Sequence, residues 1–65
     1  MITAHLEPEG ATRTFEDVRS VLKLLRLLGR RPNTVLVIRD GGLLTPDVML
    51  RNGDVVTVRG VTSRG

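Results

Sequence analysis

Cysteine, tryptophan and tyrosine are absent from this 65-residue sequence, and Phe15 is its only aromatic residue. Without cysteine the chain can form no disulfide and no thiolate metal site, and a single histidine, His5, cannot hold a metal ion alone. We therefore expect no metal site and a reducing, cytoplasmic setting. Proteins that bind single-stranded nucleic acid stack bases on exposed aromatic rings, so the near absence of rings argues against direct nucleic-acid binding.

Long apolar runs are also missing. A helix that spans a bilayer needs about 20 consecutive apolar residues, far more than any stretch here provides, so we expect no membrane partner. The start of the sequence has no basic region followed by an apolar core, and we expect no signal peptide. A domain this small has little room for an internal active-site cavity. We therefore expect its function at the surface or at a terminus, without catalytic residues of its own.

The first third of the sequence predicts a β-hairpin. Residues 2–7 alternate apolar and polar, which is the pattern of a half-buried strand with Ile2, Ala4 and Leu6 on its inner face. The next three residues, PEG, are typical of a turn. Residues 11–13 are then expected to form a short second strand that completes the hairpin.

A helix is predicted over residues 15–28. Thr14 is a suitable N-cap, because its hydroxyl can accept a hydrogen bond from a first-turn amide, and Gly29 is typical of a C-terminal stop. Apolar residues at helical spacing form one face that must pack on the sheet: Phe15, Val18, Val21, Leu22, Leu25 and Leu28.

Basic residues gather on another face of this helix, because 3.6 residues per turn brings positions i, i+4, i+7 and i+11 together. The formal net charge of the chain is +3. Two interpretations of the basic face stay open: a solvated surface, or a docking surface for an acidic partner or tRNA. Its members are Arg19, Lys23, Arg26 and Arg30, all expected to be exposed.

The second half of the sequence predicts further strands separated by turns. Residues 34–39 are β-branched and strand-like, and residues 55–59 are expected to form the last strand. Pro46 restricts any strand between residues 43 and 50 to a short or edge strand. Turns are expected at residues 40–42 (DGG) and 51–54 (RNGD).

This order of elements predicts an α+β fold, a mixed sheet of about four to five strands with the helix packed on one face. The strand–helix–strand order suggests a crossover that could bring the first and last strands together in parallel, but the sequence alone does not fix this pairing. The expected core between helix and sheet contains Leu22, Leu25, Leu36, Ile38, Val56 and Val58. Alternation then assigns a second set to the outer face, where it forms either a docking patch or an ordinary sheet surface: Val35, Val37, Arg39, Thr57 and Arg59, with His5 nearby.

Three segments, in this order and spacing, resemble the ThiS/MoaD superfamily of ubiquitin-like sulfur carrier proteins: residues 32–39 (PNTVLVIR), 43–46 (LLTP) and 51–58 (RNGDVVTV). A Thr-Phe pair followed by a leucine-rich segment extends the resemblance over nearly the whole chain. The most specific feature is the Asn-Gly-Asp turn that enters the last strand, followed by a short tail ending in glycine. Within the superfamily, the sequence looks closest to the carriers of the thiamine pathway and of tRNA thiolation. The resemblance implies a ubiquitin-like β-grasp fold.

The resemblance also implies a mechanism and partners. An activating enzyme would use ATP and Mg²⁺ to adenylate the C-terminal carboxylate. Sulfur from a donor such as a cysteine desulfurase or a rhodanese-type protein would then convert it to a thiocarboxylate. A sulfur-accepting synthase or a tRNA thiolase would take the sulfur. The chain itself would bind no cofactor and would act as a carrier rather than as an enzyme.

On this interpretation residues 1–60 form the domain and residues 61–65 a flexible tail. Gly65 would carry the adenylated, sulfur-bearing carboxylate, and because glycine has no Cβ its backbone can approach a reactive centre closely. The family ends in Gly-Gly, whereas this sequence places a long charged side chain before its last glycine. The tail residues expected to enter the partner are Val61, Thr62, Ser63 and Arg64.

Two other interpretations remain. The chain could be a non-conjugated ubiquitin-like interaction module that docks through its sheet face, in which case binding would survive removal of the tail. It could instead be a small RNA-binding domain that uses the helix cations Arg19, Lys23, Arg26 and Arg30, which a steep salt dependence of binding would indicate. ATP–pyrophosphate exchange that depends on Gly65 would separate the carrier from both.

Overall fold

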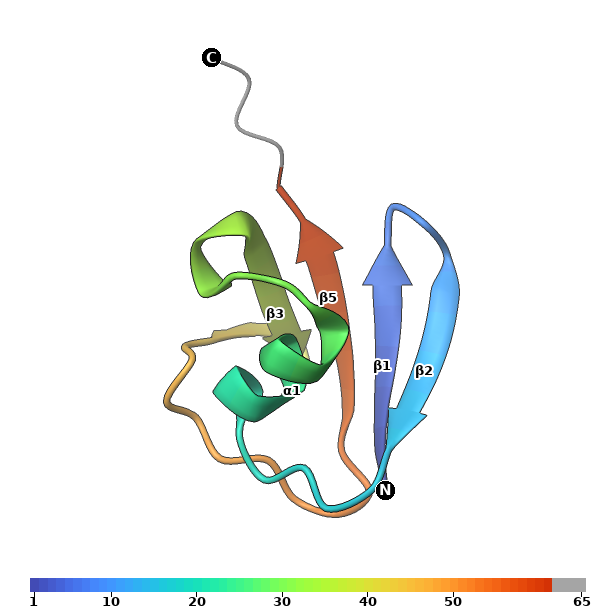
Figure 1. The fold of residues 1–65 in the computed structure, drawn as a ribbon, viewed down its shortest axis with the longest axis vertical. Coiled ribbons are helices and arrows are strands. Elements are labelled where there is room, and N and C mark those ends of the chain that lie inside the picture. The colour runs from blue at the N-terminus through green and yellow to red at the C-terminus, as the bar shows by residue number, and fades with distance from the viewer. Residues whose placement is uncertain (62–65) are drawn as a thin grey trace.

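The computed structural model describes residues 1–61, which form one mixed sheet and one helix (Figure 1). The predicted tail residues Thr62, Ser63, Arg64 and Gly65 lie outside the described residues. The elements, in chain order, are β1 (Ile2–Glu7), β2 (Ala11–Phe15), α1 (Val21–Leu28), the short 3-10 helix η1 (Pro32–Thr34), β3 (Val35–Arg39), β4 (Gly42–Leu44) and β5 (Val55–Gly60).

The five strands are ordered β2-β1-β5-β3-β4 across the sheet. Strands β1 and β5 run parallel, and the other neighbouring pairs run antiparallel. Helix α1 covers one face of this sheet (Figure 1). The predicted α+β, β-grasp-like fold is confirmed, and the structure settles the pairing of the first and last strands, which the sequence left open, as parallel. The last strand in the sequence therefore lies at the centre of the sheet.

The core lies between α1 and the inner face of the sheet. Its largest fully buried side chains are those of Ile2, Val21, Leu24, Leu25, Val56 and Val58. The alternation predicted for the first strand is confirmed, since Ala4 and Leu6 are buried with Ile2 while His5 is exposed. A domain of this size buries only about 60% of its unfolded surface, so each of these contacts is a large part of its stability.

The predicted faces of β3 are wrong. Leu36 and Ile38 were expected in the core, yet Leu36 is exposed and Ile38 only half-buried, whereas Val35 and Val37 are buried. The cause is the antiparallel register with β5, in which Val37 pairs with the inward-facing Val58. Directly paired residues share a face of the sheet, so the inward face of β5 fixes the inward face of β3.

The predicted start of the helix is also wrong. Strand β2 continues through Phe15, which pairs with Ile2, so Thr14 is a strand residue and not an N-cap. The actual N-cap is Ser20, whose hydroxyl accepts a 3.1 Å hydrogen bond from the Lys23 amide. Asp17 has a φ of 60°, a left-handed conformation that no residue inside a right-handed helix adopts.

The later start shifts the buried arc of the helix. Leu24 is buried, although the predicted apolar face did not include it, and Leu22 is 44% exposed, although it was expected in the core. Val18 and Leu25 are buried as predicted. The predicted stop at Gly29 is confirmed: its φ is 72°, and its amide donates to the carbonyl oxygen of Arg26 at 3.1 Å.

The predicted turns are confirmed at both places. Asp40 and Gly41 have positive φ values of 54° and 80° and join β3 to β4 as a two-residue hairpin loop. Gly53, after Asn52, has a φ of 96° in the turn that enters β5. The segment containing Pro46 forms only the short edge strand β4, as predicted.

Candidate functional site at the end of strand β5 and on the outer sheet face

The end of β5 lies beside the end of β1, because these two strands run parallel. Their last pair in register is Glu7 and Arg59, and the Arg59 Nε donates to the Glu7 carboxylate at 2.9 Å. Both side chains are about half exposed, so this pair adds little stability but places one charge of each sign at the rim of the sheet. Arg59 was predicted on the outer face, and the structure places it there, on the same rim as Gly60.

A second ion pair, between Arg30 and Glu9, lies at the same end of the molecule. Arg30 follows the C-terminus of α1 and Glu9 belongs to the turn between β1 and β2. A hydrogen bond from its own backbone amide, and then that from Arg30, lower the pKa of the Glu9 carboxyl below its usual value. Arg30 was expected to be as exposed as the other helix cations, but it is half-buried because it packs into this pair. Its Nη1 lies 3.6 Å from the position that a Cβ atom on Gly60 would occupy.

Two shallow hollows flank Gly60 at this rim, one bordered by Arg30 and Thr34 and the other by Glu7 and Arg59. The chain leaves β5 between them. The Val61 amide donates a 2.9 Å hydrogen bond to the Thr34 carbonyl oxygen, which fixes the first predicted tail residue against η1. We call Gly60, Val61 and the two ion pairs the exit rim.

The outer face of the sheet, opposite α1, carries exposed apolar side chains. Register places His5, Thr57 and Ile38 side by side across three strands, and Glu7, Arg59 and Leu36 in the next row toward the exit rim. The apolar members include Leu36, Leu43 and Val55, which are 37%, 67% and 52% exposed, together with the half-buried Ile38. We call this set, with His5 and Thr57, the outer sheet patch.

The structure brings together only part of the predicted docking surface. His5, Thr57 and Arg59 lie on the outer face as predicted, whereas the assignment of Val35 and Val37 to that face is wrong because both are buried under α1. Arg39 comes two residues after Val37 in β3, so its side chain leaves the sheet on the same face as that of Val37. Its predicted place on the outer face is therefore wrong as well.

Arg39 is held away from the outer patch by an ion pair. Its Nη1 donates to the Asp54 carboxylate at 2.8 Å, and both side chains are partly buried. The same carboxylate accepts a 2.9 Å hydrogen bond from the Arg51 amide. This amide bond first, and then Arg39, lower the pKa of Asp54 below its usual value, despite the opposing effect of partial burial. The pair ties β3 to the turn that starts β5.

His5 is exposed, and its Nδ1 lies 3.0 Å from the Thr12 hydroxyl oxygen. Within residues 1–61, no group of three His, Asp or Glu side chains is arranged to hold a metal ion. No helix in this described part of the chain is long and apolar enough to cross a bilayer.

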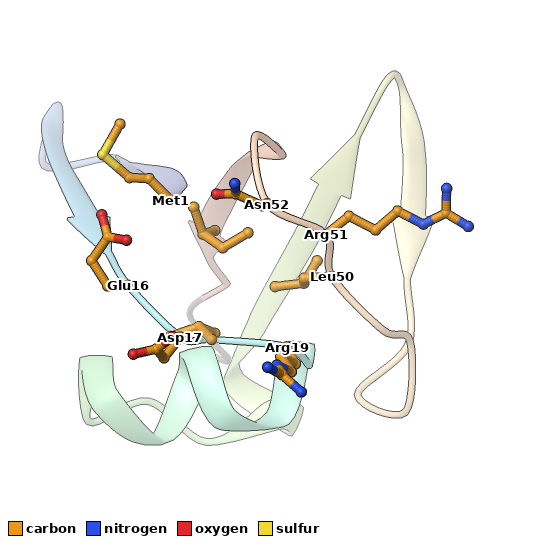
Figure 2. Close-up of a pocket in the computed structure, with 9 residues that line it drawn as sticks. Met1, Glu16, Asp17, Arg19, Leu50, Arg51 and Asn52 are labelled. Carbon is orange, nitrogen blue, oxygen red and sulfur yellow. The ribbon is translucent and has the colours of Figure 1, made fainter.

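A third hollow, of about 470 Å³, lies at the other end of the sheet (Figure 2). Glu16 and Asp17 line one side, Arg19 and Leu50 line another, and the Arg51 side chain extends away from it (Figure 2). Its lining mixes both signs of charge with apolar atoms, and it shares no residue with the exit rim or the outer sheet patch. We therefore assign it no ligand.

Sequence reasoning missed Leu36, Ile38, Leu43 and Val55 as outer-face residues. The run Val35–Ile38 is apolar at every position, so alternation alone cannot say which half faces inward. The clearer alternation of the last strand, with Val56 and Val58 inward, is the signal that could have fixed the faces of β3 once their pairing was assumed. The comparisons add no relative: no protein-family model matches this chain, and no curated protein matches it.

Proposed function

We propose that this chain is a ubiquitin-like sulfur carrier whose C-terminal glycine, Gly65, is adenylated by an activating enzyme and then carries sulfur as a thiocarboxylate. The observation that carries the proposal is the position of β5. Among residues 1–61 it is the last element, it lies at the centre of a β-grasp-like sheet, and it leads the chain to the exit rim. A terminus that starts at the centre of a folded sheet is held rigidly at its base.

The reach of the tail supports this role. Five residues follow Gly60, and five extended residues span at most about 18 Å. That length can carry a carboxylate away from the domain and into a partner's active site, where it must meet an α-phosphate in line. The hydrogen bond from Val61 to Thr34 gives the tail a defined starting direction.

The chemistry belongs to the partners and balances without a cofactor on this chain. A carboxylate oxygen of Gly65 attacks the α-phosphorus of Mg²⁺-bound ATP, and pyrophosphate leaves. The terminal sulfur of a persulfide on the donor, a cysteine desulfurase or rhodanese-type protein, attacks the acyl carbon, and AMP leaves. A second thiol then cleaves the acyl disulfide, and the thiocarboxylate passes its sulfur to a synthase or a tRNA thiolase. We place these steps in the cytoplasm.

The outer sheet patch supports a docking role in the same function. Singly exposed apolar residues are normal on protein surfaces, but here Leu36, Ile38 and Leu43 lie on adjacent strands. Charged groups of both signs, Glu7 and Arg59, border the patch toward the exit rim. An activating enzyme that covered this patch would hold the tail base beside its own active site.

The test is ATP–pyrophosphate exchange and intact-mass analysis with candidate activating enzymes, ATP, Mg²⁺ and a persulfide donor. We expect exchange that requires this chain, and a product in which sulfur replaces one oxygen. The chain that lacks Gly65 should melt at the same temperature and give neither signal. Intact mass of the protein from its native cells must show Gly65 at the C-terminus; a longer chain would contradict the proposal.

A second candidate is a non-conjugated interaction module, and the exposed outer sheet patch is the observation that favours it. The two candidates differ in their need for the tail. A module would bind its partner through Leu36, Ile38 and Leu43 with equal affinity whether or not residues 62–65 are present, and it would support no exchange.

A further inference from the structure

Helix α1 exposes a face of a distinct composition. Its eight residues include two cations and no acid. Lys23 and Arg26 are exposed, and so is Arg19 just before the N-cap. Leu22 and Leu27 are also exposed, at 44% and 47%. We call these five residues the basic helix face.

The order of residues around the helix axis gives this face a pattern. At about 100° per residue, Leu22 and Leu27 lie about 140° apart, and Arg26 and Lys23 lie between them. A strip of positive charge is therefore bordered by leucine on both sides. The buried residues Val21, Leu24 and Leu25 occupy the opposite arc, against the sheet.

The cations of this face are unpaired within residues 1–61. The three ion pairs in that part of the chain use Arg30, Arg39 and Arg59, and none reaches the basic helix face. Lys23 lies in the first turn, where the helix dipole disfavours a positive charge, and it stands three residues from the like-charged Arg26. Both placements cost stability locally, and a feature of this kind points to a surface kept for binding.

The location of the face separates it from the proposed carrier site. Helix α1 packs on the inner face of the sheet (Figure 1). Its basic face lies opposite the buried arc of Val21, Leu24 and Leu25, and is therefore directed away from the sheet. The outer sheet patch lies on the other side of the molecule. A partner on each surface could therefore be bound at the same time.

We infer that the basic helix face docks an acidic amphipathic helix of a second protein. Carboxylates on that helix would pair with Lys23, Arg26 and Arg19, and apolar side chains beside them would cover Leu22 and Leu27. The leucine borders favour protein over RNA, because nucleic-acid surfaces of this kind use exposed aromatic rings and the chain has only Phe15, which is half-buried. The inference does not depend on activation of Gly65.

The test uses a synthetic helical peptide with glutamates along one stripe and leucines on both sides of it, titrated into ¹⁵N-labelled full-length protein. We expect saturable binding, with amide shifts concentrated at α1. Arg26→Glu should weaken binding about tenfold, since it turns an attractive contact into a repulsive one. Arg13→Glu changes the net charge equally but lies on β2, and should leave the dissociation constant unchanged.

A second pair of measurements separates protein from RNA as the occupant. The double variant Leu22→Ser, Leu27→Ser replaces two leucines outside the core, so it should stay folded with a melting temperature lowered by only several degrees, and it should weaken peptide binding several-fold. If this variant bound the peptide as tightly as the unchanged protein does, charge attraction alone would explain the binding, and the inference would be overturned. So would an equal loss with Arg13→Glu, shifts centred on the sheet, or tighter binding of poly-uridine RNA than of the peptide at the same salt concentration.

Discussion

The backbone amide of Val61 donates a 2.9 Å hydrogen bond to the carbonyl oxygen of Thr34, and this bond fixes the direction in which the chain leaves the sheet. Thr34 is the last residue of η1 and comes directly before β3. The bond therefore holds Val61, the base of the tail, beside the start of β3. A single neutral hydrogen bond contributes only about 1 kcal/mol to stability. Its effect on the position of the tail base should therefore exceed its effect on folding.

Val61→Pro tests this relationship because proline has no amide hydrogen. We expect a melting temperature close to that of the natural chain and about tenfold slower adenylation, since errors of about 1 Å in reactive geometry cost up to a hundredfold. Val61→Ala keeps the amide and is the matched control; it should activate normally. Equal rates for the proline and alanine variants would show that the hydrogen bond does not position the tail.

Leu25 and Leu22 form a matched pair for the core assignment. Both are leucines of α1, but Leu25 is 1% exposed and Leu22 is 44% exposed. Leu25→Ala should lower the free energy of unfolding by about 2–5 kcal/mol, because it leaves a cavity between helix and sheet. Leu22→Ala should cost less than about 1 kcal/mol. Urea unfolding of both variants gives the comparison, and similar losses would contradict the helix register.

The same two leucines illustrate what the sequence could and could not predict. Periodicity established that a helix packs an apolar face on the sheet, and Gly29 marked its end. The start was wrongly predicted at Thr14, because its residue type suits an N-cap as well as that of Ser20, the actual cap. Thr14 belongs instead to β2, because Phe15 pairs with Ile2, and local propensity does not reveal a contact between strands.

Strand β3 shows the same limit for the candidate site. The strand itself was predicted correctly, because β-branched residues dominate it. Its two faces were exchanged, because Leu36 and Val37 are both apolar and only the pairing of Val37 with Val58 distinguishes them. A slip of one residue reverses every side chain of a strand. The outer sheet patch therefore had to be defined from the register.

The outer sheet patch gives a prediction about docking. Leu36→Ser with Leu43→Ser removes exposed apolar surface, so the melting temperature should change by only a few degrees. We expect the affinity for the activating enzyme to fall about tenfold or more, measured by calorimetry, because apolar anchors dominate such interfaces. The double variant Leu22→Ser, Leu27→Ser changes an equal number of exposed leucines on α1 and should bind that enzyme normally. A loss in both variants would contradict a docking surface confined to the sheet.

Asp54 should make stability depend on pH. Its pKa is lowered in the folded state by the Arg51 amide and by Arg39, so its contribution is complete above the unfolded value of about 3.9 and is lost as the pH falls through the folded pKa. Asp54→Asn should cost on the order of 1 kcal/mol at neutral pH. The gap between the two proteins should close as the pH falls below about 4.

Urea unfolding of both proteins from neutral to acid pH measures this gap. The pKa values of Glu9 and Asp47 are also lowered, but both carboxyls are present in both proteins, so they cancel in the difference. A gap that stays constant across the range would show that the Asp54 charge is not what stabilises the turn before β5.

The penultimate residue of the sequence gives the prediction that bears most directly on function. Carriers of the superfamily that the sequence resembles end in Gly-Gly, whereas the last two residues here are Arg64 and Gly65. If the activating enzyme receives the tail through a channel shaped for glycine, Arg64→Gly should speed adenylation without changing the melting temperature, because the variant alters only the tail. If this chain has its own dedicated enzyme, that enzyme should carry acidic groups for the Arg64 guanidinium, and Arg64→Gly should slow adenylation by that enzyme.

Either change in rate would show that the enzyme recognises the tail. Arg64→Lys keeps the charge and therefore distinguishes recognition of charge from recognition of shape. Equal exchange rates for all three endings, or no exchange with any of them, would leave the interaction module as the function that the outer sheet patch supports.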